Sequence, residues 1–305
     1  MTAEPTVSAL AVSSAATPAV LDRLAAVGGI VFDVDGCLVL SDNPGGHGGQ
    51  LLPGAAEALQ EVRASGRSVV VFTNASSQVP AQLAASLHEL GLDVTEDDVL
   101  TPSVVAAEVV LERYGARPVL AFGGPGLIDV LTAAGVELTD RSDPSSAAAV
   151  VVGWDTAFDR DSMQSAADAI WSGADLLVCS DARRFASRTR PMAGVGGFIA
   201  AGLSYVTKCD YEVLGKPSPA AMVIAARRLG VSADRVLVAG DDLTLEVRMA
   251  RAADGMGVLV TTGMHGAADV AAAPPGDEPD LVVAGLPELL DHLRLADAAA
   301  AARRA

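Results

Sequence analysis

Four short polar groups, each following an apolar run, carry the side chains in this sequence that could do chemistry. Taken singly, each group is also typical of an ordinary turn, since Asp, Asn, Thr and Gly favour turns at strand ends. Two acidic groups at one sheet edge repel each other unless a cation compensates them, so their combination indicates a cation site. The groups are Asp33-Val34-Asp35-Gly36, Thr73-Asn74, Gly215-Lys216-Pro217 and Gly240-Asp241-Asp242, with Glu246 downstream.

These side chains match the needs of phosphoryl transfer. Carboxylate oxygens suit Mg²⁺, which binds one or two carboxylates and keeps positions for water and phosphate. One aspartate beside the metal can attack phosphorus, and a second carboxyl can give a proton to the leaving oxygen and later take one from water. Lys216 and the Thr73 hydroxyl can neutralise and hydrogen-bond phosphoryl oxygens.

Composition restricts the partners and the compartment. The chain has 305 residues and a formal net charge of −17 at pH 7, which without a basic run argues against nucleic acid or an anionic membrane surface. An anionic substrate therefore needs a local cation, and Lys216 is one of two lysines beside 19 arginines. No apolar stretch approaches the roughly 18 residues of a membrane span, and the N-terminus lacks a signal-peptide pattern. With three widely spaced cysteines, we expect a cytoplasmic protein with free thiols.

The elements that must position these side chains alternate regularly along the chain. Short β-branched runs predict strands at Gly29–Asp33, Ser68–Phe72, 118–122, 148–152, 176–179, 235–239, 257–260 and Leu281–Val283. Alanine-rich segments of helical periodicity predict helices at 54–64, 80–90, Pro102–Tyr114, 160–172 and Pro219–Leu229. Apolar strands alternating with helices indicate an α/β fold with a parallel sheet covered on both faces. Ligands of such folds bind beyond the carboxyl ends of the strands, where the polar groups fall.

In this order the four groups resemble the four motifs of the haloacid dehalogenase superfamily of phosphotransferases. The long interval between Thr73 and Lys216 leaves room for a large cap domain. Segments 119–131, 150–158 and 173–185 resemble the cap of one class IIA subfamily. That subfamily contains 4-nitrophenylphosphatase and the phosphoglycolate, pyridoxal-phosphate and NagD-type nucleotide phosphatases.

The resemblance implies a Rossmann-like parallel core with an inserted α/β cap. We expect a disordered tail over residues 1–20, a discontinuous catalytic core over 21–102 and 208–296, and a C2-type cap over 103–207. Relatives often pair through their caps, so a homodimer through the cap is a possible partner arrangement.

The family's site residues transfer by motif position. The nucleophile falls on Asp33, and the general acid/base, two residues on, falls on Asp35. The metal ligands fall on Asp33, Asp241 and the backbone carbonyl of Asp35. Thr73 and the backbone of Asn74 would hold phosphate.

Lys216 would steady both the nucleophile and the phosphate, but the fourth motif departs from the family pattern. The position of its usual second aspartate is Glu246, so the resemblance assigns neither Glu246 nor Asp242 a role at the metal.

Other segments keep alternatives open. The glycine-rich flap 41–50 (SDNPGGHGGQ) is longer than usual; we favour an unstructured insertion over a lid. The cap loop that usually reads Thr-Asn-Pro-Asp is here Cys179-Ser180-Asp181-Ala182, so the substrate contacts of relatives do not transfer. We expect Trp154 and Phe158 to pack inside the cap. The segment Gly123-Gly124-Pro125-Gly126 does not match a dinucleotide-binding fingerprint, because the position of the third required glycine is Asp129.

In this family an acid/base residue at the second aspartate of the first motif, here Asp35, implies a phosphatase, because a dehalogenase has no leaving oxygen to protonate. We therefore predict a phosphoric monoester hydrolase that is Mg²⁺-dependent and acts through an aspartyl-phosphate. Its substrate would be a small-molecule phosphate ester: a sugar, glycolate or glycerol, nucleotide or cofactor phosphate. The alternatives are a phosphotransferase or mutase of the same superfamily, and a non-catalytic phosphate-binding regulatory protein.

Overall fold

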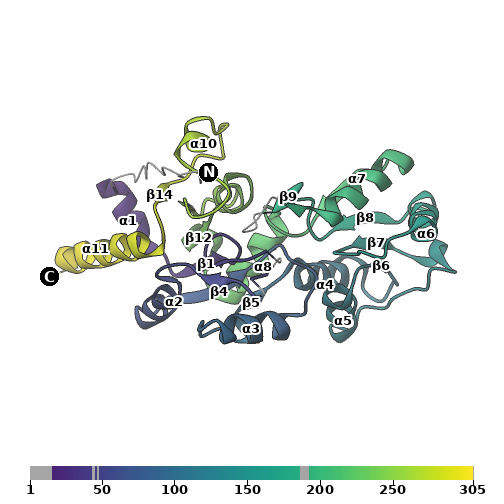
Figure 1. The fold of residues 1–305 in the computed structure, drawn as a ribbon, viewed down its shortest axis with the longest axis horizontal. Coiled ribbons are helices and arrows are strands. Elements are labelled where there is room, and N and C mark those ends of the chain that lie inside the picture. Colours follow the sequence, from purple (N-terminus) through teal and green to yellow (C-terminus); the bar gives the residue numbers. More distant parts are fainter. Residues whose placement is uncertain (1–15, 43–44, 47, 186–191, 305) are drawn as a thin grey trace, which may run out of the picture.

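The chain is built around two β-sheets, each made of parallel strands, which follow one another along the long axis of the molecule (Figure 1). The computed structural model describes residues 16–42, 45–46, 48–185 and 192–304. Within them the larger sheet has the strand order β14-β13-β12-β1-β4-β5, and the smaller has the order β11-β8-β7-β6. Neighbouring strands are parallel in both sheets, which confirms the predicted α/β fold.

Three of the four polar groups lie at strand ends of the larger sheet. They are the groups that contain Asp33, Thr73 and Asp241. In β1 all residues are buried: Ile30 and Phe32 pack into one hydrophobic cluster, and Val31 packs into the cluster on the opposite face. This two-sided burial explains why the strand is continuously apolar. The strands are β1 Gly29–Asp33, β4 Ser68–Phe72, β5 Val99–Leu100, β12 Val236–Gly240, β13 Met256–Val260 and β14 Leu281–Val283.

Helices cover both faces of this sheet. One face packs against α1 Pro18–Ala26, α2 Ala55–Ala64, α3 Pro80–Glu89 and α11 Leu286–Arg304, and the other against α8 Pro219–Leu229 and α9 Arg248–Arg251.

The predicted disordered tail over residues 1–20 is wrong at its end. Helix α1 begins at Pro18, because the Thr17 hydroxyl accepts a hydrogen bond from the Val20 amide and proline suits the first helical position. Residues 1–15 lie outside the described residues.

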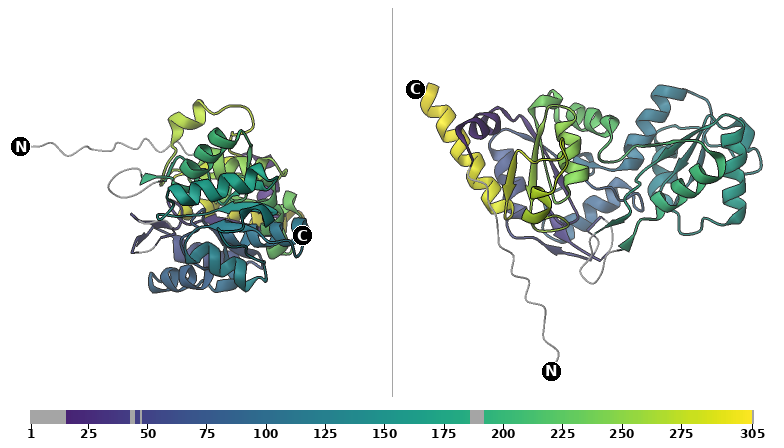
Figure 2. Two further views of the ribbon diagram at one scale, coloured as in Figure 1. Left: turned by 90° about the vertical axis from the view of Figure 1, so that its right-hand side faces the viewer. Right: turned by 90° about the horizontal axis from the view of Figure 1, so that it is seen from above.

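The smaller sheet is also sandwiched between helices, as the two views of Figure 2 show. Its strands are β6 Leu120–Phe122, β7 Ala149–Val152, β8 Asp175–Val178 and β11 Tyr211–Val213. Helices α4 Pro102–Tyr114 and α5 Pro125–Ala133 pack on one face, and α6 Arg160–Trp171 and α7 Val195–Thr207 on the other.

One strand falls on the other side of the expected domain boundary. We expected the core to resume at residue 208, but Tyr211–Val213 pairs in parallel with β8 and so belongs to the smaller sheet. The chain adds this edge strand before it returns toward Lys216.

The remaining elements are short. Two antiparallel pairs are β2 Val39–Leu40 with β3 Gln50–Leu51, and β9 Arg184–Phe185 with β10 Met192–Ala193. Helix α10 spans Ala267–Ala271, 3₁₀ turns span Glu96–Asp98, Pro144–Ser146 and Ala233–Arg235, and a π-helical turn spans Leu243–Val247. None of the helices in the described part of the chain has the length and apolarity needed to cross a bilayer.

Candidate active site

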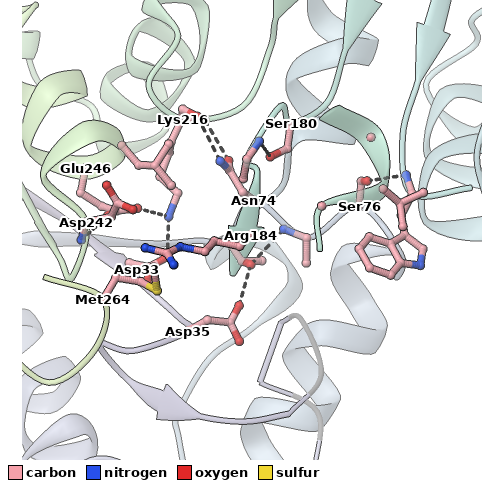
Figure 3. A pocket seen from close by; sticks show the side chains of 18 of the residues that line it. Asp33, Asp35, Asn74, Ser76, Ser180, Arg184, Lys216, Asp242, Glu246 and Met264 are labelled. Atoms are coloured by element: carbon pink, nitrogen blue, oxygen red, sulfur yellow. Dashed lines mark hydrogen bonds and ion pairs between the residues drawn. The ribbon is translucent and has the colours of Figure 1, made fainter. Parts of the chain in front are cut away.

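The polar groups from distant parts of the sequence meet in one pocket (Figure 3). They meet because β1, β4 and β12 are neighbours in the parallel sheet and end at the same edge. The structure brings together all of the predicted site residues: Asp33, Asp35, Thr73, Asn74, Lys216 and Asp241.

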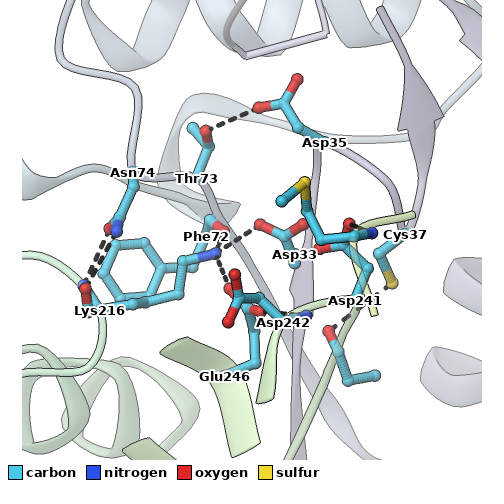
Figure 4. Close-up of polar contacts among 12 residues, drawn as sticks. Asp33, Asp35, Cys37, Phe72, Thr73, Asn74, Lys216, Asp241, Asp242 and Glu246 are labelled. Atoms are coloured by element: carbon cyan, nitrogen blue, oxygen red, sulfur yellow. Dashed lines mark hydrogen bonds and ion pairs between the residues drawn. The ribbon is translucent and has the colours of Figure 1, made fainter. Parts of the chain in front are cut away.

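Lys216 lies at the centre of the polar contacts (Figure 4). Its Nζ donates to Asp33 Oδ1 and, at 2.9 Å, to the carbonyl oxygen of Phe72, and it lies 2.6 Å from Glu246 Oε1. The side chain is only 2% exposed. Burial alone would lower the pKa of Lys216, but the Asp33 and Glu246 carboxylates outweigh burial and raise it. Lys216 is therefore a fixed positive charge held against Asp33.

Three buried carboxylates lie in the pocket with this one ammonium group, and two of them, Asp33 and Glu246, contact it. Burial raises the pKa of Asp33 to about 6, against the lowering effect of Lys216, and burial likewise raises the pKa of Glu246 to about 7. Burial, Asp33 and Glu246 together raise the pKa of Asp241 well above its usual range. The cluster carries more potential negative charge than Lys216 can balance, so it favours binding of a further cation.

The carboxylate of Asp241 is held by very close backbone packing. The Met264 amide donates to its Oδ2 at 2.7 Å. A Cβ atom added at Gly36 would lie 2.2 Å from Asp241 Oδ2, and one added at Gly263 would lie 1.8 Å from it. Both positions therefore require glycine for this approach of backbone to carboxylate.

The donor set fits a magnesium ion. Among the described residues, no group of three or more His, Cys, Asp or Glu side chains is arranged as a metal-binding cluster. Mg²⁺ does not need one, because one or two carboxylates with carbonyl, water and phosphate oxygens complete its coordination. Asp33 and Asp241 would supply the carboxylates and Asp35 the carbonyl, and the uncompensated negative charge favours a divalent ion.

The carboxylate of Asp35 contacts the glycine-rich flap. The amides of Gly45 and Gly46 donate to it at 2.8 and 3.1 Å, and the Thr73 hydroxyl donates at 3.2 Å. Burial raises the pKa of Asp35, and these three hydrogen bonds oppose the increase. Gly45 and Gly46 thus hold part of the flap against Asp35, but neither lines the pocket, so the lid stays a hypothesis. Asn43, Pro44 and His47 of the flap lie outside the described residues.

The Asn74 side chain contacts the main chain of Lys216. Its Oδ1 accepts from the Lys216 amide at 2.8 Å, and its Nδ2 donates to the Lys216 carbonyl at 3.0 Å. A Cβ atom at Gly215 would lie 2.5 Å from Asn74 Oδ1, so the glycine before the lysine permits this contact. Asn74 thus fixes where the motif carrying Lys216 meets the sheet edge.

Glu246 and Asp242, which sequence reasoning left unassigned, have separate contacts. Asp242 Oδ1 accepts from the amide and the hydroxyl of Thr244, both at 2.7 Å, and so caps the π-helical turn. Glu246 accepts from the Asp242 amide at 3.1 Å through Oε2 and pairs with Lys216 through Oε1. A Cβ atom at Gly240 would lie 2.2 Å from Glu246 Cγ. Glu246 therefore forms an ion pair with Lys216, whereas Asp242 stabilises the local turn.

Residues of the smaller sheet and its loops complete the pocket, and sequence reasoning missed most of them. Phe158 packs edge-on against Phe122, with ring centroids 5.3 Å apart, which confirms its place inside the cap. Trp154 is only half-buried and lines the pocket, so its expected place in the cap core is wrong. Ser180 and Arg184 also line it. Their position in the sequence, after β7 and β8, could have identified them, because residues that follow the carboxyl ends of parallel strands line ligand sites.

Comparison with known proteins gives a consistent family. The model of the haloacid dehalogenase-like hydrolases matches residues 30–137, and a HAD-hydrolase-like model matches residues 213–289. A haloacid dehalogenase-like hydrolase domain-containing protein 2 from Bos taurus is 30% identical over 87% of this chain and 95% of its own.

Two solved structures share the fold closely. A glycerol phosphate phosphatase from Mycobacterium tuberculosis, in complex with magnesium, has a TM-score of 0.78 and 28% identity, over 88% of this chain and 78% of its own. A 4-nitrophenylphosphatase from Thermotoga maritima has a TM-score of 0.77 and 28% identity, over 88% of this chain and 97% of its own. The predicted resemblance is confirmed, and this chain belongs to the haloacid dehalogenase-like hydrolase family.

Proposed function

We propose that this protein is a Mg²⁺-dependent phosphatase that hydrolyses a small-molecule phosphate monoester through an aspartyl-phosphate. The observation that carries the proposal is the pairing of Asp33 with a buried Lys216, beside Asp35 and Asp241 in one pocket. Support also comes from relatives that are named phosphatases, among them the glycerol phosphate phosphatase and the 4-nitrophenylphosphatase.

In the first step Asp33 acts as the nucleophile. Lys216 holds Oδ1, so we assign the attack to Oδ2. A bond forms from this oxygen to phosphorus while the bond from phosphorus to the ester oxygen breaks. The Asp35 carboxyl gives its proton to that leaving oxygen, and its raised pKa favours the protonated form at the start of the step.

In the second step water releases the phosphate. The Asp35 carboxylate takes a proton from water, whose oxygen bonds to phosphorus as the bond to Asp33 breaks. Lys216 acts on the phosphoryl group through its positive charge beside Asp33, and both Lys216 and Thr73 line the pocket. A Mg²⁺ ion held by Asp33, Asp241 and the Asp35 carbonyl would neutralise charge on the phosphoryl group.

The cap is proposed to enclose the substrate. We assign residues 103–207 together with β11 to the cap, since β11 lies in the smaller sheet. Trp154 and Ser180 from the cap line the same pocket as Asp33, so the leaving group would lie between the two parts. A pocket closed in this way favours small substrates over polymers. The homodimer through the cap stays a prediction. Helix α7 of the cap exposes two aromatic side chains, Phe198 and Tyr205, which are 81% and 86% accessible to solvent.

The nucleophile is tested by Asp33→Asn. We expect phosphate release from 4-nitrophenyl phosphate with Mg²⁺ to fall to background, while circular dichroism shows a retained fold. Asp291→Asn removes the same charge at a side chain that is 68% exposed and should leave turnover unchanged. Turnover retained by Asp33→Asn contradicts the mechanism.

The same assay separates the alternatives. Free phosphate released with no added acceptor supports a hydrolase over a phosphotransferase or mutase. Loss of release with a chelator and its return with added Mg²⁺ support the metal. Absence of any release across sugar, glycolate, glycerol, nucleotide and cofactor phosphates would favour the non-catalytic alternative.

A further inference from the structure

Arg184 is a cation of the pocket that the proposed chemistry does not use. It lies in β9 and lines the same pocket as Asp33 and Lys216. In the view of Figure 3 its side chain extends across the pocket and overlaps Asp33. Its guanidinium has no hydrogen bond or ion pair within the part of the chain that the structure describes, and it is exposed to solvent.

The backbone that carries Arg184 is held in place. Arg184 pairs with Ala193 across the β9–β10 ladder, and the Gly194 amide donates to the Arg183 carbonyl at 3.0 Å. A Cβ atom at Gly194 would lie 1.7 Å from the Ala182 carbonyl oxygen, so the backbone segments next to the β9–β10 pair approach too closely there for any other residue. These contacts fix the backbone of Arg184 beside the pocket that its side chain lines.

Lys216 has no capacity for a second anionic group on the ligand. Its three contacts are Asp33, Glu246 and the Phe72 carbonyl, and it is 2% exposed. Among the residues that line the pocket, Lys216 and Arg184 are the cations. A negative charge on the leaving group would therefore find its partner at Arg184.

The location of Arg184 matches the expected place of the leaving group. Asp33 and Asp241 are at the core edge, so a phosphoryl group bound there directs the rest of the ester toward the cap. On the cap side the first turn of α7 lines the pocket at Gly194, Val195 and Gly196, and the amides of a helix N-terminus favour negative charge. The core wall carries the carboxylates of the pocket, which repel anions, so the cap wall is the side where an anion is stabilised.

We propose that Arg184 recognises a second anionic group on the leaving group. The planar guanidinium offers two parallel N–H donors that match a carboxylate or a phosphate. The preferred substrates are then phosphate monoesters that also carry a carboxylate or a second phosphate. The inference rests on the proposed phosphatase function and names its substrate class.

The test uses pairs of substrates that differ only in this charge. Phosphoglycolate is compared with 2-hydroxyethyl phosphate, and 1,3-propanediol bisphosphate with 3-hydroxypropyl phosphate. The wild type should show a higher kcat/KM for the charged member of at least one pair, and that pair identifies the carboxylate or the phosphate as the group recognised. Arg184→Met should reduce the ratio by about 10- to 100-fold, the range expected for a charge-assisted hydrogen bond.

A matched control lies one residue away. Arg183→Met removes the same charge from a side chain that does not line this pocket, and it should keep the wild-type ratio. Arg184→Lys keeps the charge without the planar fork and should give an intermediate ratio. Wild-type ratios near one for both pairs, an unchanged ratio in Arg184→Met, or an equal fall in Arg183→Met overturns the inference.

Binding separates failure of the inference from failure of the proposed function. If no ester is hydrolysed, the phosphatase proposal fails. Titration calorimetry with Mg²⁺ then compares phosphonoacetate with 2-hydroxyethylphosphonate. Tighter binding of phosphonoacetate to the wild type, lost in Arg184→Met and kept in Arg183→Met, supports the role of Arg184, and equal binding of both ligands overturns it.

Discussion

The two walls of the pocket are built in different ways. On the core wall each charged group has several fixed partners: Lys216 has three acceptors, the Asp35 carboxylate has three donors, and Asp241 is wedged against glycines. On the cap wall Trp154 is half-buried and Arg184 ends in solvent.

This difference suggests a division of work. Groups that stabilise a transition state must be held before the substrate arrives, because reorganisation during the reaction would cost rate. Groups that only select a leaving group can be fewer and more exposed. Substitutions on the core wall should therefore lower kcat for every substrate, while those on the cap wall should change the ranking of substrates.

Lys216→Met should give the largest effect of the core-wall substitutions that leave the nucleophile in place. It leaves the buried carboxylates of Asp33 and Glu246 without their partner. We expect kcat to fall about 10²- to 10³-fold for every ester, as when one preorganised donor is removed. Loss of one member of a buried ion pair should also lower the free energy of unfolding by about 3–5 kcal/mol. Steady-state kinetics and urea unfolding measure the two effects.

The other lysine supplies the control for this prediction. Lys208→Met removes an ammonium group at the C-cap of α7 and should change neither kcat nor the urea midpoint by much. Lys216→Arg sharpens the prediction, because a planar fork cannot replace a point charge among three acceptors in a buried site. Near-normal kcat in Lys216→Arg contradicts the view that this wall is rigid.

Glu246→Gln should give the second largest effect. It keeps the side chain length but removes the negative charge beside Lys216. We expect kcat to fall about 10-fold, since a charged hydrogen bond of roughly 1.5 kcal/mol is weakened, with KM little changed. Asp242→Asn is the matched control in the same turn, because Asp242 caps Thr244 and does not contact Lys216. An equal loss in both variants would show that the turn as a whole matters, not the contact with Lys216.

The sequence predicted the core wall far better than the cap wall. Strands β1, β4 and β14 and helix α8 have the predicted bounds, because uninterrupted apolar runs and proline at the first helical turn mark them. The motifs follow those strands directly, so a parallel sheet brings them to one edge.

The cap wall depends on tertiary contacts that leave little trace in a linear pattern. Helix α7 was not predicted, because Gly196, Gly197 and Gly202 weaken its propensity, although Gly196 and Gly197 pack against backbone of the loop after β8. Residues 211–213 were not predicted as a strand and fell within the expected core range, since nothing in these three residues shows that they pair with β8. Arg184 resembles any surface arginine until the β9–β10 pair places it beside the pocket.

The flap gives the smallest expected effect and tests how far the fixed core wall extends. Gly45→Ala and Gly46→Ala place Cβ atoms at residues with φ of +81° and +77°, where alanine is strained, and whose amides bind Asp35. We expect kcat to fall about 5-fold, equivalent to the loss of a hydrogen bond worth about 1 kcal/mol. Gly46→Ala is the cleaner variant, because a Cβ at Gly45 would also lie 2.5 Å from Leu83 Cδ2, whereas one at Gly46 would meet no atom nearer than 3.2 Å.

A third glycine of the flap separates strain from contact. Gly48 also has a positive φ, +65°, and a Cβ there would meet no atom within 4 Å. Gly48→Ala therefore carries similar backbone strain without a contact to Asp35. If all three variants lose the same activity, backbone strain at these glycines is the cause, and not the contact with Asp35. If only Gly45→Ala and Gly46→Ala lose activity, the hydrogen bonds to Asp35 are what matter, and the flap belongs with the rigid core wall because it holds the acid/base in place.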